Sequence, residues 1–224
     1  MAARIFKLVI LGAPASGKGT ISQRIVKVFH LKHISSGDKL RQHIQNKTAV
    51  GLEAQKYINE GKLVPDEVMI KFIKCELQKV EDESWLLDGF PRTLSQAIAL
   101  WELEKLDLAI NLLVPYQAII DRVKGRWVHL ASGRVYNDGF NPPKVHGVDD
   151  VTGEPLIQRD DDKPEVVLKR LEQYEKMTGP VATFYREKGI LKEFCGDETN
   201  VIWPKVLEWL CTSIPLHITT QEPS

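Results

Sequence analysis

Residues 8–20 read Leu-Val-Ile-Leu-Gly-Ala-Pro-Ala-Ser-Gly-Lys-Gly-Thr, an apolar run followed by a glycine-bounded loop and a helical pattern. In such a loop the backbone N–H groups converge on an anion at the positive end of the helix, and glycines let the chain approach the oxygens. Lys18 can then reach the β- and γ-phosphates of a nucleotide. The usual pattern has Ser or Thr directly after the lysine, whereas here Gly19 intervenes and the hydroxyl comes at Thr20. The stretch predicts a phosphate-binding loop of a particular subclass.

The composition is that of an ordinary globular protein. With 224 residues, 43% of them hydrophobic and 27% charged, we expect one main domain with a single α/β core. The 30 basic and 30 acidic residues cancel, so no net field attracts nucleic acid or an anionic lipid surface. No apolar run approaches about 18 residues, which argues against a membrane span. We therefore expect no nucleic acid or membrane partner, and we expect the chain to be a monomer.

Strand and helix patterns alternate along the chain. Apolar runs predict strands over 5–11, 33–35, 85–88, 108–114 and 190–194. Helical spacing covers 20–29, 38–45, 65–80, 94–104, 116–124, 164–186 and 201–211. Helix-start signals stand at Pro65, at Thr93 with Gln96 three residues later, and at Asp162 with Glu165 three residues later. The alternation predicts a mostly parallel sheet with helices on both faces and ligands at the carboxyl ends of the strands.

One segment departs from this alternation. Between residues 127 and 158, turn signals such as Ser132-Gly133 and Asn141-Pro142-Pro143 recur every few residues. A loop of that length is uncommon inside a compact domain unless it works as a lid or a binding element. We therefore expect a lid here, with a small β-rich decoration that has no role as the alternative.

Charged residues gather where predicted strands end. Asp88 ends one strand and can hold water on a magnesium ion, and Arg92 follows it at the ligand edge of the sheet. Further arginines flank strand ends or the turn-rich segment, at positions 41, 122, 126, 159 and 170. A phosphate monoester is already an anion near neutral pH, so phosphoryl transfer needs cations and positioning more than a general base. The pattern predicts phosphoryl transfer between two bound phosphates.

Several motifs together resemble the adenylate kinase family, and the resemblance runs from Leu8 to about Pro204. They are residues 12–20, 35–38 with Arg41, 61–64, 88–93 with Gln96, and 133–136. The chain looks like the long-lid type. Further similarity, in Trp127 and in 141–145, 153–156 and 198–204, points to the branch that works in the mitochondrial matrix with GTP as phosphoryl donor and AMP as acceptor.

The resemblance implies a fold and a division of the chain. It implies the α/β P-loop NTPase fold, with a five-stranded parallel sheet and helices on both faces. The core would comprise residues 1–34, 65–124 and 163–224. An AMP-binding insertion would span 35–64, called the first insertion below, and a lid would span 125–162, called the lid segment below.

Carried over position by position, the resemblance also implies the site. The donor nucleotide would meet Ala15, Ser16, Gly17, Lys18, Gly19, Thr20, Arg122, Arg126, Val135, Tyr136 and Thr199. AMP would meet Ser36, Arg41, Lys62, Leu63, Val64, Gly89, Phe90, Pro91, Arg92, Gln96, Arg159 and Arg170. The catalytic residues would be Lys18, Arg92, Arg126, Arg159 and Arg170. Mg²⁺ is the expected cofactor, held by Asp88 through water.

Two departures from the family pattern carry expectations of their own. Some long-lid relatives hold zinc with four cysteines, but none of the cysteines of this chain lies in the lid segment. We expect no zinc site, and a hydrogen-bond network in its place among His129, Ser132, Asp149 and Thr152. The second departure is Ala15, where the family usually has glycine. If this position needs a positive φ, alanine is strained by about 1 kcal/mol.

Rival interpretations remain open at the level of the sequence. A regulatory GTPase should carry an Asn-Lys-x-Asp motif, and the run 46–49 fails at its fourth place, Ala49. A nucleotide-binding pseudoenzyme is motivated only by Ala15, and the intact Lys18 and arginines argue against it. A kinase of UMP or CMP is less favoured, because Gln96 resembles the adenine-reading glutamine. Side chains do not reveal whether GTP, ATP or ITP is the preferred donor.

The location is predicted from the first part of the chain and from the resemblance. No acidic residue precedes Asp38, while several basic residues do. Such an N-terminal part is weakly similar to an import signal, although the phosphate-binding loop limits how far a cleaved segment can extend. We expect the mitochondrial matrix, with the cytoplasm as the alternative.

Overall fold

Five parallel strands form the central sheet, in the order β2-β3-β1-β4-β7. The computed structural model describes residues 4–59, 62–139, 141–159 and 162–214. The strands are β1 (Lys7–Gly12), β2 (Lys32–Ser35), β3 (Trp85–Asp88), β4 (Leu108–Leu113) and β7 (Leu191–Cys195). Each predicted strand is confirmed to within about two residues at either end, which is the usual precision of element boundaries.

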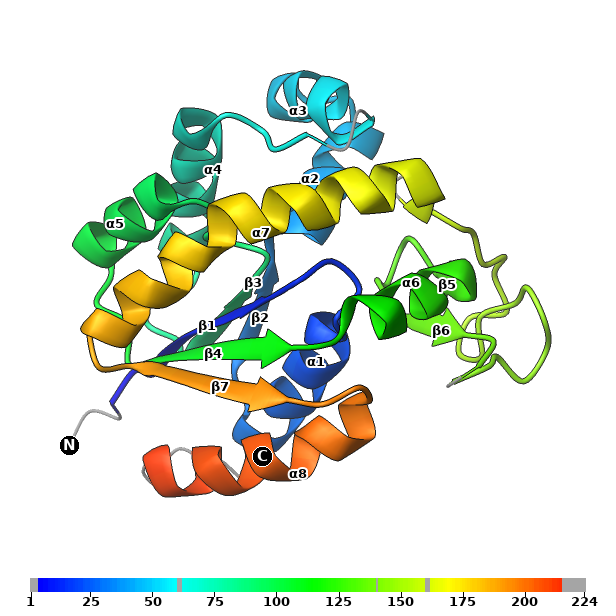
Figure 1. Ribbon diagram of the computed structural model, residues 1–224. Coiled ribbons are helices and arrows are strands. Elements are labelled where there is room, and N and C mark those ends of the chain that lie inside the picture. Colours follow the sequence, from blue (N-terminus) through cyan, green and yellow to red (C-terminus); the bar gives the residue numbers. More distant parts are fainter. Residues whose placement is uncertain (1–3, 60–61, 140, 160–161, 215–224) are drawn as a thin grey trace, which may run out of the picture.

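Strand β1 is buried on both faces, because its side chains alternate between two cores. Leu8 and Ile10 pack in one core, with side chains of α1 (Lys18–Phe29) and α8 (Thr199–Ser213). Val9 and Leu11 pack in the other, with α4 (Asp66–Gln78) and α5 (Leu94–Leu103). Figure 1 shows α8 on one side of the sheet and α4, α5 and α7 on the other. The loop after β1 is thus attached to a strand that is buried between the two cores.

The longest helix, α7 (Pro164–Glu187), belongs to both cores. Val167 and Leu171 near its start pack in the core of α1 and α8, whereas Val181 and Tyr185 pack in the core of α4 and α5. Between these anchors the helix passes over the carboxyl half of the sheet (Figure 1). None of the helices in the described ranges is long and apolar enough to span a bilayer.

The first insertion contains two helices, α2 (Ser36–Gln45) and α3 (Ala49–Asn59). The sequence predicted α2, whereas α3 was missed, and Gly51 in its first turn is one reason, because glycine disfavours helix. The structure explains that glycine. A Cβ at Gly51 would lie 2.2 Å from the carbonyl oxygen of His43, so the glycine allows α2 and α3 to pack closely.

The lid segment follows α6 (Tyr116–Lys124) and lies beyond the carboxyl end of β4 (Figure 1). It holds the antiparallel pair β5 (Arg126–Val128) and β6 (Val135–Asn137). Isolated bridges join Val128 to Ile157, Asn137 to Asn141 and Val148 to Pro155, and most other residues described in this segment lie in turns and loops. The turn-rich character expected from the sequence is confirmed, and the exact limits of the two insertions stay a prediction.

Two of the predicted helix-start signals work differently from the expectation. The Thr93 side chain accepts from the Gln96 N–H at 3.2 Å, as a cap should, but the Gln96 amide oxygen accepts from the Arg92 N–H instead of completing a capping box. At α7 the cap residue is Lys163 and no side chain caps the helix. The prediction of an Asp162 cap was wrong, because its carboxylate binds Arg126 instead.

Candidate active site

The loop between β1 and α1 has the backbone that a phosphate-binding loop requires. Gly12, Ala15 and Gly17 have φ values of 149°, 57° and 90°. The positive φ at Ala15 meets the condition under which the sequence predicted strain for alanine. The ammonium group of Lys18 donates to the carbonyl oxygens of Gly12 and Ala13 at 2.7 Å each, which holds this side chain along the loop.

Neighbouring elements pack tightly against this loop. A Cβ added at Gly17 would lie 2.3 Å from the Cγ2 atom of Thr199, so only glycine fits there. The buried Arg122 donates through Nη1 to the Ala15 carbonyl at 3.3 Å and through Nη2 to the Asp197 carbonyl. Arg122 and Thr199, both expected in the donor site, therefore lie against the loop, where they also fix its shape.

The charge of Lys18 is strongly affected by its surroundings. Exclusion of water from the ammonium group lowers the pKa of Lys18 from 10.5 to about 8. The Asp88 carboxylate acts in the opposite direction. The guanidinium groups of Arg92, Arg170 and Arg126 lower the pKa further. Three arginines that the resemblance divides between two nucleotides therefore all affect the charge of the loop lysine.

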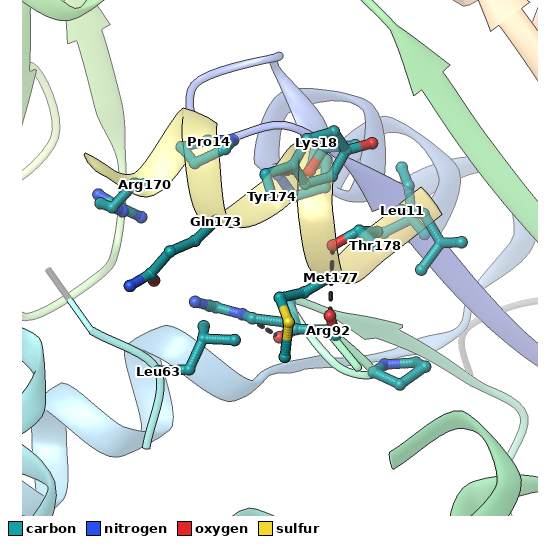
Figure 2. Close-up of a pocket in the computed structure, with 14 residues that line it drawn as sticks. Leu11, Pro14, Lys18, Leu63, Arg92, Arg170, Gln173, Tyr174, Met177 and Thr178 are labelled. Atoms are coloured by element: carbon teal, nitrogen blue, oxygen red, sulfur yellow. Dashed lines mark hydrogen bonds between the residues drawn. The ribbon is translucent and has the colours of Figure 1, made fainter. Parts of the chain in front are cut away.

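A cavity lies between the loop and α7 (Figure 2). The loop contributes Pro14 and Lys18, and α7 contributes residues from Arg170 to Thr178. Figure 2 shows Gln173 and Met177 extending from α7 toward Arg92. The Arg92 side chain is held by its Nε–H, which donates to the Gly89 carbonyl at 2.7 Å.

A second cavity lies between the first insertion and the sheet. It is lined by Ser36, Gly37, Leu40, Arg41, Ile58, Lys62, Leu63, Val64, Met69, Gly89, Arg92, Gln96 and Arg170. Four of these residues also line the first cavity: Leu63, Gly89, Arg92 and Arg170. The two cavities therefore adjoin at two arginines, and most of the residues expected to meet AMP surround the second one.

A buried hydrogen-bond network fixes Gln96 beside the second cavity. Its amide oxygen accepts from the Arg92 N–H and its amide nitrogen donates to Asp66, both at 2.8 Å. The other Asp66 oxygen accepts from the Thr93 hydroxyl at 2.8 Å. Sequence reasoning used Asp66 only as an acid in the first turn of α4, and no local signal ties it to Gln96.

Two polar residues, Ser36 and Asp88, lie at the adjacent carboxyl ends of β2 and β3, where Ser35 pairs with Asp88. Asp88 pairs with Ile10 in the strand register and is 8% exposed, with the His33 Nε2 atom 3.9 Å from one of its oxygens. The hydroxyl of Ser36 is buried and finds no hydrogen-bond partner among the described residues. A Cβ at Gly89 would lie 2.7 Å from that hydroxyl, so the glycine keeps it accessible to the cavity.

The lid segment contacts the first insertion through Asp38. One carboxylate oxygen of Asp38 accepts from Arg41 at 2.5 Å and from Arg159 at 3.2 Å. Burial acts to raise the pKa of this carboxyl, but the two arginines outweigh it and hold the pKa below its usual range. Asp38 thus brings together two arginines that the resemblance assigns to AMP.

A further arginine of the lid segment, Arg126, is paired with Asp162. Its Nε–H donates to Oδ2 at 2.7 Å and its Nη2–H donates to Oδ1, which makes a two-point contact. The side chains are 14% and 4% exposed. The arginine follows α6 and the aspartate precedes α7, so this pair joins the two ends of the lid segment.

Inside the lid segment, Asp149 is the centre of a hydrogen-bond network. Its carboxylate accepts from Arg134 at 2.8 and 2.6 Å, from Tyr136 at 2.9 Å and from the Thr152 hydroxyl at 2.9 Å. The bond from Arg134 is the main reason why the pKa of Asp149 lies far below its usual range. His129 contacts the Ser132 hydroxyl at 2.7 Å and the Thr152 hydroxyl at 3.5 Å. The network expected in place of four cysteines is confirmed.

Many expected site residues do not line these two cavities. Of the residues expected to meet the donor, only Lys18 does; the others are Ala15, Ser16, Gly17, Gly19, Thr20, Arg122, Arg126, Val135, Tyr136 and Thr199. Of the residues expected to meet AMP, Phe90 and Arg159 line neither cavity. Phe90 packs in the core of α4 and α5, while Pro91 lines the first cavity. Tyr136 is buried in the lid network and Val135 beside it is 38% exposed. Gln173, which lines the first cavity, was not singled out in the sequence, because a glutamine inside a helix carries no signal of its own.

The fold, the phosphate-binding loop and the two adjoining cavities define a nucleotide-binding P-loop protein, and the chain belongs to the adenylate kinase family. The family model described as adenylate kinase matches residues 10–190. The chain is 54% identical over 204 residues to a Drosophila melanogaster protein named "GTP:AMP phosphotransferase, mitochondrial", covering 91% of this chain and 94% of that one. It is 47% identical over 211 residues to a Saccharomyces cerevisiae protein of the same name, covering 90% of each. The resemblance read from the sequence is confirmed.

Proposed function

We propose that this protein transfers the terminal phosphoryl group of GTP to AMP, reversibly and with Mg²⁺, and forms GDP and ADP. The observation that carries the proposal is the pair of adjoining cavities, which share Arg92 and Arg170 at the place where they meet. Two nucleotides bound from opposite sides would present their phosphates to each other there. In-line transfer requires this arrangement.

On the donor side, the loop and its lysine would hold the phosphates. The backbone N–H groups of residues 15–20 supply donors at the positive end of α1, and Lys18 supplies a cation to the β- and γ-phosphates. Arg122 and Arg126 would add charge from α6 and the lid segment. Val135, Tyr136 and Thr199 would lie near the base.

On the acceptor side, AMP would occupy the second cavity. The unsatisfied hydroxyl of Ser36 and the guanidinium group of Arg41 offer donors for its phosphate. Val64 and Gln96 would contact adenine, with the glutamine amide oriented by Asp66. Arg159 and Arg170 would reach the transferred group from the lid segment and from α7.

The residues present fit Mg²⁺, which prefers hard oxygen ligands and keeps several waters. Asp88 is a nearly buried carboxylate at the end of β3, next to β1 and its loop, and its oxygens accept no hydrogen bond from the described residues. Thr20 offers a hydroxyl at the start of α1. Mg²⁺ would neutralise phosphate charge, with Thr20 as a ligand and Asp88 holding its waters.

The chain's own groups account for the remaining requirements of the reaction. AMP needs no general base, since its phosphate, with a second pKa of about 6, is already an anionic nucleophile at neutral pH. The cations Lys18, Arg92, Arg126 and Arg170 would stabilise the charge that spreads over the transferred group. The lid segment would exclude water, which otherwise accepts the phosphoryl group.

The donor base rests on the names of the relatives, and initial rates test it. Rates are measured with GTP, ATP and ITP in turn, each against AMP, CMP and UMP. The highest kcat/KM with GTP and AMP supports the proposal. A preference for ATP gives the ordinary adenylate kinase reaction instead, and no transfer with any pair leaves a nucleotide-binding pseudoenzyme.

We further propose that the protein works in the mitochondrial matrix as a monomer. The names of both relatives and the absence of acids before Asp38 support the location. Fractionation of cells tests it, and native protein confined to the cytosol would contradict it. Sedimentation equilibrium at micromolar concentration tests the monomer.

A further inference from the structure

The pair between Arg126 and Asp162 is unusual for a surface segment. A lid that opens to water gains little from an ordinary exposed ion pair, which contributes almost nothing to stability. Here the carboxylate is 4% exposed and both of its oxygens are engaged by one guanidinium group. A contact of this kind fixes an arginine in one orientation, because the planar fork matches the carboxylate at two points.

Asp162 has no other evident work in the described structure. It does not cap α7, whose cap residue is Lys163. Its own position is fixed by its backbone N–H, which donates to the Arg159 carbonyl at 3.0 Å. The carboxylate is thus set at the base of the long helix α7, from which Arg170 also faces the first cavity.

The contact leaves part of the guanidinium group available. Arginine has five N–H donors, and the fork uses the Nε edge and one Nη2 hydrogen. The Nη1 end remains for a phosphate. The charge of Arg126 also acts to lower the pKa of Lys18, in the phosphate-binding loop.

We propose that Asp162 is a positioning residue, which orients Arg126 so that its Nη1 end meets the transferred phosphoryl group when the lid segment covers the site. The inference rests on the proposed function, because it assigns Asp162 to the transition-state arginine of that reaction. Asp162 itself touches no substrate. Asp162 would affect the rate only through Arg126, so an experiment can distinguish this role from a purely structural one.

A set of six proteins tests the inference. Wild type is compared with Asp162→Ala, Asp162→Asn, Arg126→Ala and the double variant Asp162→Ala/Arg126→Ala. Asp138→Ala is the matched control, since this lid carboxylate accepts from the Trp127 indole at 3.0 Å. Steady-state kcat, the KM for AMP and the melting temperature are measured for each.

If Arg126 loses its orientation, kcat should fall. We expect Asp162→Ala to lower kcat by roughly a hundredfold, the size expected when a catalytic group is displaced by about 1 Å. The KM for AMP should stay within about twofold. Asp162→Asn keeps one of the two acceptor oxygens and should lose only about tenfold. The double variant should equal Arg126→Ala, because without the arginine nothing is left to orient.

Other outcomes would overturn the inference. If Asp162→Ala keeps its kcat within twofold, or if the losses multiply in the double variant, Asp162 does not act through Arg126. A higher kcat would mean that the pair restrains Arg126. Should Asp162→Ala unfold at the assay temperature, Asp162→Asn carries the same comparison. An inactive wild type, in contrast, contradicts the proposed function itself.

Discussion

The phosphate-binding loop and the lid segment enclose the same predicted donor site, but different forces hold their shapes. The loop depends on its backbone: left-handed residues at Gly12, Ala15 and Gly17, and a Thr199 side chain that leaves no space for a Cβ. The lid segment depends on side chains, chiefly carboxylates that each engage an arginine, as Asp149 and Asp162 do.

This difference has chemical consequences. A shape made by backbone and packing stays the same when pH or salt changes, so the loop can hold Lys18 in a fixed place. A shape made by charged pairs responds to substitution of either partner, and its energy in contact with water is small. The comparison predicts that substitution of Lys18, the cation of the loop, lowers activity strongly. Substitution of residues in the charged pairs of the lid segment should lower it by smaller amounts that differ from pair to pair.

The largest effect should follow Lys18→Ala. Its ammonium group would meet the donor phosphates in both the ground state and the transition state, so both binding and rate should suffer. We expect kcat/KM for GTP to fall by more than about ten-thousandfold. Lys27→Ala, an exposed position on the same helix, is the control and should keep full activity. Activity within tenfold of wild type in Lys18→Ala would remove the loop from the mechanism.

Arg126→Ala should come next. The lid arginine would act on the transferred group and not on AMP, so AMP affinity should stay nearly unchanged while kcat falls by on the order of a thousandfold. Equilibrium binding of AMP and single-turnover rates separate the two quantities. Near-wild-type transfer by this variant would contradict the role given to the lid arginines.

Asp149→Ala should give a smaller loss, of roughly tenfold in kcat, because the cover over the site loses its shape while every catalytic cation remains. The melting temperature should fall as well, since Arg134, Tyr136 and Thr152 lose a common acceptor. Elemental analysis of the wild type is the companion measurement. One tightly held zinc per chain would mean that metal, and not this network, shapes the lid segment.

The lowered pKa of Lys18 predicts that GTP binding is accompanied by the uptake of less than one proton per nucleotide bound. With a pKa of about 8 the free lysine is mostly neutral at pH 8.5. Bound phosphates raise that pKa, and they are themselves fully ionised at this pH, so GTP binding should take up protons. Titration calorimetry in buffers of different ionisation enthalpy measures the uptake. It should disappear at pH 6.5, where the lysine is already charged; equal uptake at both pH values would exclude Lys18 as its source.

The smallest effect should come from Ala15→Gly. Glycine removes the strain of φ 57°, worth about 1 kcal/mol, but it also gains conformational entropy in the unfolded chain, worth roughly 0.4–1 kcal/mol. We expect unfolding free energy to change by less than about 1 kcal/mol. Urea unfolding measures this change. If the Ala15→Gly variant is stabilised by more than this, the alanine strains neighbouring residues in addition to its own backbone.

Local patterns predicted the parts of the molecule whose signals are contiguous. The phosphate-binding loop, the five strands and the cap at Thr93 can each be predicted from a few consecutive residues. Helix α3 was missed because Gly51 weakens its pattern, and that glycine exists for a contact with His43 on another helix.

Hydrogen bonds and ion pairs between residues far apart in the chain cannot be predicted from such local patterns. Gln96 is oriented by Asp66, and Arg126 by Asp162, and no sequence spacing links either pair. Asp162 even carries a false signal, since an aspartate before a helical pattern normally predicts a cap. Which partner a carboxylate takes is decided by the fold, after the sheet and α7 have brought the candidates together.

The central place of β1 bears on how the molecule is assembled during synthesis. Its neighbours in the sheet are β3, which begins at Trp85, and β4, which ends at Leu113. Pairing over such distances must first overcome the entropy of closing long loops, and it makes folding slow relative to local structure. A chain that has been synthesised only as far as the phosphate-binding loop therefore contains the sequence motif but lacks the sheet that gives the loop its shape. We therefore expect the phosphate-binding loop to take its binding shape only after β3 and β4 have joined β1 in the sheet.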